Sequence, residues 1–161
     1  MPSAAVRCIA GLAIVVAGVA AGIGTAEAAT NFPAGKFRMK HTARGQCATL
    51  KYEESGAPFV ALAPCDGKTD LQAWKYDSKT HKIHLASKPA QCMAAHIFVK
   101  KCSSKEAAKW ETRTFKKDIN VCLVGVGDCL TDFYKERGVD ALTAIKGGQN
   151  TGSNKIEFIP L

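Results

Sequence analysis

The feature that most constrains the fold of this chain is a cysteine pair followed by a tryptophan, which occurs twice. In the first copy, Cys47 and Cys65 precede the segment 70–74, which ends in a Gln-x-Trp step. In the second copy, a cysteine pair precedes Trp110, and alanine replaces the glutamine. One such unit cannot bury its apolar face alone, so copies of it are expected to share a core filled by the large aromatic residues. The sequence therefore predicts a repeated unit rather than one long motif.

A fainter third copy completes the chain. The turn before Cys129 matches the turns before Cys47 and Cys92, and Ile156 stands where the two tryptophans stand. Three units of roughly 40 residues fill 36–161, which is the period of a repeat architecture. We expect the repeats at about 36–80, 81–116 and 117–161. Their equivalent core residues are expected to be Trp74, Trp110 and Ile156.

The local pattern within each unit predicts short β-strands. Phe37 and Met39 alternate with basic residues, and apolar runs such as 59–62 are bounded by turns rich in Gly, Asp and Lys. This pattern fits an all-β barrel or sandwich and shows no alternation of strands with long amphipathic helices. The one segment with helical character is 131–139, which we expect to form a short helix.

Residues 1–28 have the pattern of a secretory signal peptide. A short segment with one positive charge precedes the uncharged apolar run 8–24, and Ala26-Glu27-Ala28 has the spacing that signal peptidase accepts. The alternative is a membrane anchor, but the run is short for a bilayer span of about 20 residues. We expect cleavage after Ala28, then a lead-in over 29–35 and one domain over 36–161. The mature protein is expected to be secreted or periplasmic, with no membrane attachment.

The cysteine count agrees with export. Cleavage removes Cys8, so that seven cysteines become an even six, as is typical of a disulfide framework in an oxidising compartment. Six cysteines allow about 15 pairings, and spacing alone does not choose among them. A metal site is not expected, because no Cys-x-x-Cys occurs and His81 and His84 would face opposite sides of a strand. The six are Cys47, Cys65, Cys92, Cys102, Cys122 and Cys129.

The net charge of +8 favours anionic partners. The lysines are dispersed along the chain, which is more typical of a solvated basic surface than of a dedicated polyanion groove. Weak polyanion binding therefore stays an alternative. The sequence has no Gly-rich phosphate loop in a strand-to-helix context and no recognisable catalytic constellation. We expect no enzyme activity, cofactor or metal.

Four segments of the first unit follow one another in a familiar order: 37–40, Gly45-Gln46-Cys47, Pro64-Cys65 and Leu71-Gln72-Ala73-Trp74. In this order they resemble one repeat of the ricin B-type lectins, a β-trefoil family. The resemblance is strong in the first unit, fair in the second and faint in the third. It implies a six-stranded barrel capped by three hairpins, with the repeated tryptophan in the core.

The resemblance also implies the disulfide pairs. The family's bond within a repeat corresponds to Cys47–Cys65 and to Cys92–Cys102. The leftover pair, Cys122–Cys129, departs from the family, whose third bond would need a cysteine near Ile145. Because Cys122 precedes the turn, we expect this pair to clamp a hairpin.

The family binds sugar in a shallow pocket of each repeat. An Asp two residues after the first cysteine accepts hydrogen bonds from sugar hydroxyls, and that position holds Thr49, Ala94 and Thr131 here. A sugar hydroxyl buried without its acceptor costs about 1–3 kcal/mol. Asp132 lies one residue beyond the expected place, on the opposite face of a regular strand, and would serve only if the strand is bulged.

Other family positions near the pocket are partly kept. The Gln of the Gln-x-Trp step is kept in the first unit, is alanine in the second and is Asn in the third. The candidate ligand-binding residues are Thr49, Gln72, Asp132 and Asn154. We expect a non-catalytic binding module with degenerate sugar pockets. Its partner is expected to be a glycan or, alternatively, a host or partner protein, as for toxin accessory subunits of this fold.

Overall fold

Four strands from each of the three predicted repeats make up the fold. The computed structural model describes residues 31–96, 98–136, 139–145 and 155–161, and gives the main chain alone for 132–136, 139, 141 and 145. The strands are β1 (Lys36–His41), β2 (Gln46–Tyr52), β3 (Pro58–Pro64), β4 (Trp74–Asp77), β5 (Lys82–Leu85), β6 (Lys88–Met93), β7 (Val99–Lys101), β8 (Trp110–Phe115), β9 (Asp118–Leu123), β10 (Cys129–Glu136), β11 (Val139–Ile145) and β12 (Ile156–Pro160). A single 3-10 turn, η1 (Asp70–Gln72), precedes β4.

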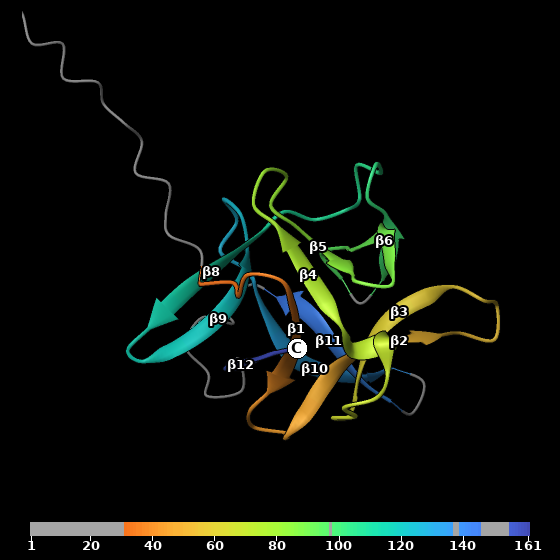
Figure 1. The fold of residues 1–161 in the computed structure, drawn as a ribbon, viewed down its shortest axis with the longest axis horizontal. Helices are drawn as coiled ribbons and strands as arrows, with labels where there is room; N and C mark the ends of the chain where they lie inside the picture. The colour runs from red at the N-terminus through yellow and green to blue at the C-terminus, as the bar shows by residue number, and fades with distance from the viewer. Residues whose placement is uncertain (1–30, 97, 137–138, 146–154) are drawn as a thin grey trace, which may run out of the picture.

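The first and fourth strands of each repeat form a barrel. Strand β1 pairs antiparallel with β12 and β4, β4 pairs with β5, and β8 pairs with β9. The amide of Trp110 donates to His81 O at 2.7 Å, which joins the start of β8 to the start of β5, and β12 lies against β9. The hairpins β2–β3, β6–β7 and β10–β11 extend from this barrel (Figure 1). A six-stranded barrel with three hairpins is the arrangement that the sequence resemblance implied.

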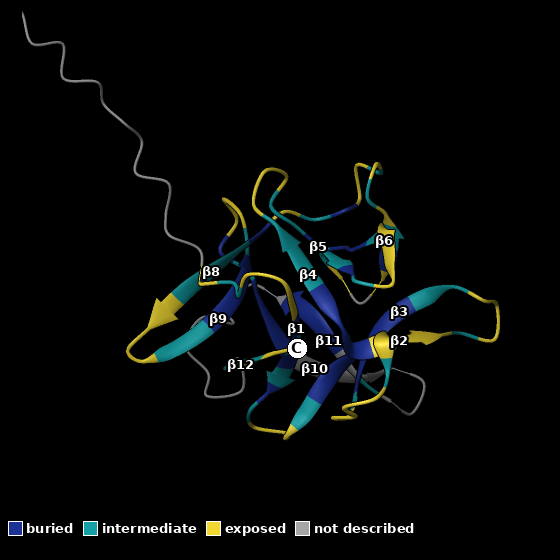
Figure 2. Ribbon diagram, in the orientation of Figure 1, coloured by how far each residue is buried: buried dark blue, intermediate teal, exposed yellow. Residues whose placement is uncertain are grey.

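The predicted core residues occupy equivalent places. Trp74, Trp110 and Ile156 are the first residues of β4, β8 and β12, and all three are buried. The indole Nε1 of Trp74 donates to Ala48 O at 2.9 Å, and that of Trp110 donates to Met93 O at 3.4 Å. Ala48 and Met93 each follow the first cysteine of their repeat, so the two tryptophans are held in the same way. Figure 2 shows the buried residues gathered where the barrel strands converge.

The three disulfides have the predicted pairs: Cys47–Cys65, Cys92–Cys102 and Cys122–Cys129. The first two close loops within the first and second repeats, over 18 and 10 residues. The third joins Cys122 of β9 to Cys129 of β10, which lie directly opposite each other in the sheet. The prediction of a hairpin clamp in the third repeat is therefore confirmed.

The helix expected over 131–139 is wrong. Strand β10 runs to Glu136, and β11 begins at Val139 and pairs with β10 in an antiparallel hairpin. Strand β11 is itself bound to the first repeat, where Ala141 lies opposite Ala61 of β3. A helix of this length is marginal in isolation, and pairing with β11 satisfies the same main-chain groups while placing Leu130 in the core.

The lead-in packs on the barrel from residue 31 onwards. Asn31 N donates to Thr112 Oγ1 at 2.7 Å, and the ring of Phe32 stacks on Tyr76 with centroids 4.0 Å apart. The predicted signal peptide, 1–28, lies outside the described residues. Among those that are described, no helix is long and apolar enough to cross a bilayer.

Candidate functional site

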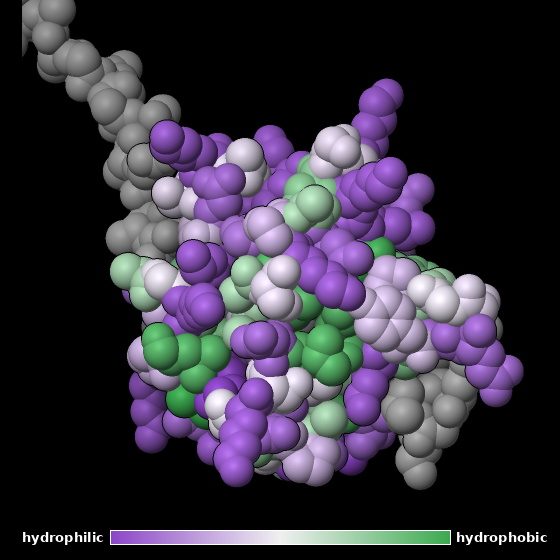
Figure 3. Space-filling model, turned by 45° about the vertical axis from the view of Figure 1, so that its right-hand side comes forward, coloured by the Kyte–Doolittle hydropathy of each residue, from purple (hydrophilic) through white to green (hydrophobic). Residues whose placement is uncertain are grey.

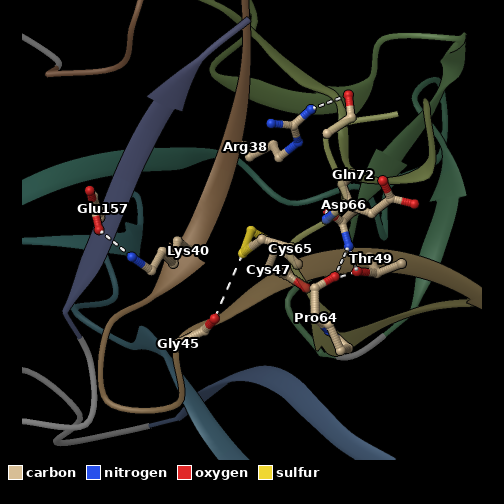
Figure 4. The surroundings of a disulfide bond; sticks show 12 residues. Arg38, Lys40, Gly45, Cys47, Thr49, Pro64, Cys65, Asp66, Gln72 and Glu157 are labelled. Atoms are coloured by element: carbon tan, nitrogen blue, oxygen red, sulfur yellow. Dashed lines mark hydrogen bonds and ion pairs between the residues drawn. A yellow bond between two sulfur atoms is a disulfide. The ribbon is translucent and has the colours of Figure 1, made fainter. Parts of the chain in front are cut away.

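The structure brings two predicted ligand-binding residues of the first repeat together, but as partners of each other. Gln72 Nε2 donates to Thr49 Oγ1 at 2.9 Å and to Pro64 O at 2.8 Å (Figure 4). Gln72 Oε1 accepts from Asp66 N at 2.8 Å. The hydroxyl of Thr49 donates in turn to Cys47 O at 2.8 Å. The Gln72 amide thus joins β2 to the end of β3 and to the loop that follows.

This arrangement leaves little of either side chain for a ligand. Gln72 is 1% exposed and Thr49 is 4% exposed. Both N–H groups of the Gln72 amide and its oxygen have protein partners. The Thr49 hydroxyl has one proton to donate, and it donates that proton to Cys47 O. Thr49 and Gln72 therefore act as an internal brace, and we call this pair the Thr49–Gln72 brace.

The second repeat fills the equivalent space with main chain and methyl groups. Ala94 is buried, and it forms an isolated antiparallel bridge with Ala107. Ala108, at the glutamine position, donates its amide to Met93 O at 3.0 Å. No side chain at these positions carries a hydrogen-bonding group, so they offer nothing polar to a sugar hydroxyl.

In the third repeat, Thr131 is buried and lies opposite Thr143. The main chain of Asp132 pairs with Leu142, and the register of the β10–β11 hairpin shifts between Asp132 and Lys135. An irregularity of this kind is what a role for Asp132 requires. The side chain of Asp132 and the whole of Asn154 lie outside the described residues, so their part in ligand binding stays a prediction.

The two histidines of the His-x-x-His sequence do not share a strand as expected. His81 lies in the turn before β5, with φ of 59°, and its Nδ1 lies 2.9 Å from Tyr76 Oη. His84 is in β5, and its Nδ1 lies 3.3 Å from Leu85 O. A left-handed turn residue ends the alternation on which the expectation of opposite faces rested. Within the described part of the chain, no cluster of three or more potential metal ligands occurs.

The same turn contains a carboxylate with a perturbed pKa. Asp77 Oδ2 accepts from Thr80 Oγ1 at 2.7 Å, and Oδ1 accepts from Lys79 N at 2.9 Å. The Thr80 hydroxyl first, and then the Lys79 amide, hold the pKa of Asp77 below its ordinary value of 3.8. This carboxylate closes the β4–β5 turn, so its lowered pKa has a structural cause.

A groove that the sequence reasoning did not identify lies on the outer wall of the barrel, beside β1 and the start of β4. Its volume is about 640 Å³. Four basic side chains and one acidic side chain contribute to its lining, and we call it the β1–β4 groove. The charged residues that line it are Lys36, Arg38, Lys68, Lys75 and Asp70.

One sequence signal points to part of the groove. Lys36 and Arg38 alternate with buried residues in β1 and therefore share its outer face. Lys75 and Lys68 come from β4 and from the loop before η1. Their position beside β1 depends on the pairing of β1 with β4, which the spacing of charges along the chain does not reveal.

Neither a protein-family profile nor a curated protein matches the sequence. Solved structures match its fold at low identity. The C-terminal half of an earthworm R-type lectin, solved in complex with GalNAc, is 13% identical, with a TM-score of 0.57 over 77% of this chain and 97% of the lectin half. ThreeFoil, a designed threefold-symmetric protein, is 12% identical, with a TM-score of 0.56 over 78% of this chain and 99% of its own. The chain is a β-trefoil.

The trefoil also resembles a part of a much larger protein. A mosquitocidal holotoxin is 16% identical, with a TM-score of 0.61 over 79% of this chain. The trefoil spans 17% of the holotoxin's length. At these identities the similarities establish the fold alone.

Proposed function

We propose that this trefoil is an extracellular, non-catalytic module that binds a glycan. The observation that carries the proposal is the fold, which the chain shares over nearly the whole length of a lectin half that was solved with GalNAc. A disulfide in each repeat supports an oxidising compartment, because such bonds are rare in the cytosol.

The proposed glycan does not bind at the family's positions in the first two repeats. The Thr49–Gln72 brace uses its own polar groups, and Ala94 and Ala108 have none to offer. A sugar placed there would leave hydroxyl groups unpaired, at about 1–3 kcal/mol for each lost hydrogen bond. Glycan recognition in this trefoil therefore needs residues outside these positions.

A second candidate is a protein partner. Several large apolar side chains are exposed, and they include Tyr52, Phe115 and Val126, the last of which is 66% exposed. Exposed apolar surface is a common feature of protein interfaces when it is contiguous. On the face drawn in Figure 3, the apolar side chains form separate patches among hydrophilic ones, an arrangement that favours a polar ligand on that face.

A glycan array at physiological salt tests the proposal. We expect the oxidised chain 29–161 to bind a restricted set of glycans saturably, and the reduced, unfolded chain to bind none of them. The matched variant Thr49→Val removes a hydroxyl of the brace, and its pattern on the array should equal that of the native protein. Failure of the folded protein to bind any glycan would overturn the proposal in favour of a protein partner.

Secretion is part of the same proposal and has its own test. If residues 1–28 are a signal peptide, the exported protein begins at Ala29. N-terminal sequencing of the protein recovered from the medium or periplasm should give Ala-Thr-Asn-Phe. A product that retains Met1 and partitions with membranes would show that the segment is an anchor instead.

A further inference from the structure

We propose that the β1–β4 groove binds an acidic saccharide through its sulfate or carboxylate groups. The inference rests on the proposed glycan-binding function and identifies a site and a ligand class for it. The groove lies on the side wall of the barrel, and neither Thr49 nor Gln72 lines it.

The first argument concerns two lysines whose like charges lie opposite each other in the sheet. Lys36 of β1 lies directly opposite Lys75 of β4 in the antiparallel register. Side chains in such pairs are close neighbours, and like charges opposite each other destabilise a sheet. An anion bound between the two ammonium groups would relieve that repulsion.

The second argument is an excess of hydrogen-bond donors. Arg38 lies two residues beyond Lys36 on the same face of β1, and its Nη2 donates to Gly67 O at 2.9 Å (Figure 4). This bond fixes the guanidinium at the groove. Arg38 Nε is buried and has no acceptor among the described residues, so a ligand would meet the positive charge of the guanidinium rather than this N–H group. A ligand that brings negatively charged oxygens suits this composition.

The third argument is the contrast with other surface lysines. Lys40 pairs with Glu157 at 3.1 Å and Lys100 pairs with Glu106 at 2.8 Å. No ion pair within the described part of the chain involves Lys36, Lys68 or Lys75. Among the described residues of the lining, Asp70 is the one acidic side chain, against four basic ones.

The lining also selects the class of anion. None of its described residues has an aromatic side chain, whereas proteins that bind single-stranded nucleic acid usually stack bases on aromatic rings. Three of the four cations are lysines, which act as point charges and need no planar partner. The disulfides support an extracellular setting, where sulfated and carboxylated glycans are the abundant polyanions. A volume of about 640 Å³ has room for a short saccharide.

Two variants test the groove by different means. Lys36→Gln with Lys75→Gln removes two charges. Gly67→Gln keeps the charge and adds bulk at a lining position where a Cβ atom would meet nothing within 4 Å and where φ is not in the left-handed region. The matched control is Lys51→Gln with Lys105→Gln, which removes two exposed lysines that do not line the groove.

The probe is a fluorescently labelled heparin tetrasaccharide, titrated at 50 mM and 150 mM NaCl. We expect Lys36→Gln/Lys75→Gln to bind it about tenfold more weakly than the native protein, from two exposed charge contacts. The steric variant Gly67→Gln should lose a similar factor, and the control should stay within about twofold. The melting temperature of Lys36→Gln/Lys75→Gln should equal or exceed that of the native protein, because a like-charge pair is removed.

The outcomes separate the alternatives. Suppose that Lys36→Gln/Lys75→Gln and the control Lys51→Gln/Lys105→Gln lose heparin affinity equally, and that Gly67→Gln binds like the native protein. Heparin would then bind through dispersed surface charge, and the groove would not be the site. Tighter binding of a single-stranded oligonucleotide of matched charge, weakened by Gly67→Gln, would overturn the ligand class. Binding of neutral glycans without heparin would overturn this inference and leave the proposed function intact. The absence of binding to any glycan would overturn both.

Discussion

Gln72 shows how a single side chain can keep a family's residue type and change its use. Its amide has three protein partners, and one of them is the hydroxyl at the position where the lectins carry a sugar-binding Asp. Thr49 is short enough to stay under the sheet surface and accept this bond, whereas alanine takes the position in the second repeat. The residue that looked most like part of a pocket is therefore part of the scaffold.

Gln72→Ala is expected to lower the free energy of unfolding by about 2–4 kcal/mol, because it leaves buried polar groups unpaired and opens a cavity. Urea denaturation followed by tryptophan fluorescence measures the change. The double variant Thr49→Ala/Gln72→Ala should cost less than the sum of the single changes, by about 1 kcal/mol. Ala94 and Ala108 show that the equivalent space of the second repeat is filled without polar side chains. Strict additivity would contradict the brace.

Asp77 gives a pH-dependent contribution at the same scale. Its pKa is lower in the folded protein than its ordinary value. Its contribution to stability is therefore present above that ordinary value and is lost as pH falls through the folded pKa. We expect Asp77→Asn to melt below the native protein at pH 7, by a margin that narrows as the pH falls below 3.8. A difference in melting temperature that does not narrow below pH 3.8 would show that charge is not involved.

At the scale of elements, the third repeat differs from the first two in how its hairpin is held. Strands β9 and β10 pair at a single position, Cys122 opposite Cys129, and the disulfide lies at that position. The equivalent pairs of the first two repeats, β1–β2 and β5–β6, are each joined at two positions. The clamp in the third repeat therefore carries a larger share of the local connection.

Removing the clamp with Cys122→Ala/Cys129→Ala is expected to destabilise the protein by about 2 kcal/mol. The loss should be local, so the amides of Thr131 and Thr143 should exchange hydrogen faster than those of β2–β3. The matched control is Cys92→Ala/Cys102→Ala, which removes a loop closed over 10 residues instead of 7. Uniform acceleration of exchange across all three hairpins would contradict a local role.

The elements also show what the sequence predicts well. The short strands and the three core positions depend on patterns that recur about every 40 residues, and repetition makes these patterns visible. The within-repeat disulfide pairs followed from the family resemblance. Segment 131–139 was expected to be helical from its own residues. Its strand character comes from pairing with β11, and β11 in turn pairs with β3, far away in the chain.

At the scale of the whole molecule, the sites were harder to predict than the fold. The Thr49–Gln72 brace joins side chains 23 residues apart, and resemblance places both beside a pocket without showing that they bond to each other. The β1–β4 groove depends on a strand pairing that sets Lys36 opposite Lys75. Dispersed lysines in the sequence indicated a solvated surface, but folding gathers some of them on one wall of the barrel.

The most direct test of the central claim is a glycan array of the oxidised chain 29–161, read at 50 mM and 150 mM NaCl. The trefoil is expected to bind sulfated or carboxylated glycans and to bind them more weakly at the higher salt concentration, because exposed ion pairs are screened. Neutral galactose and GalNAc glycans should give a weaker signal, because the first two repeats offer them no free side-chain acceptor. Strong binding of neutral glycans that does not change with salt would contradict the account.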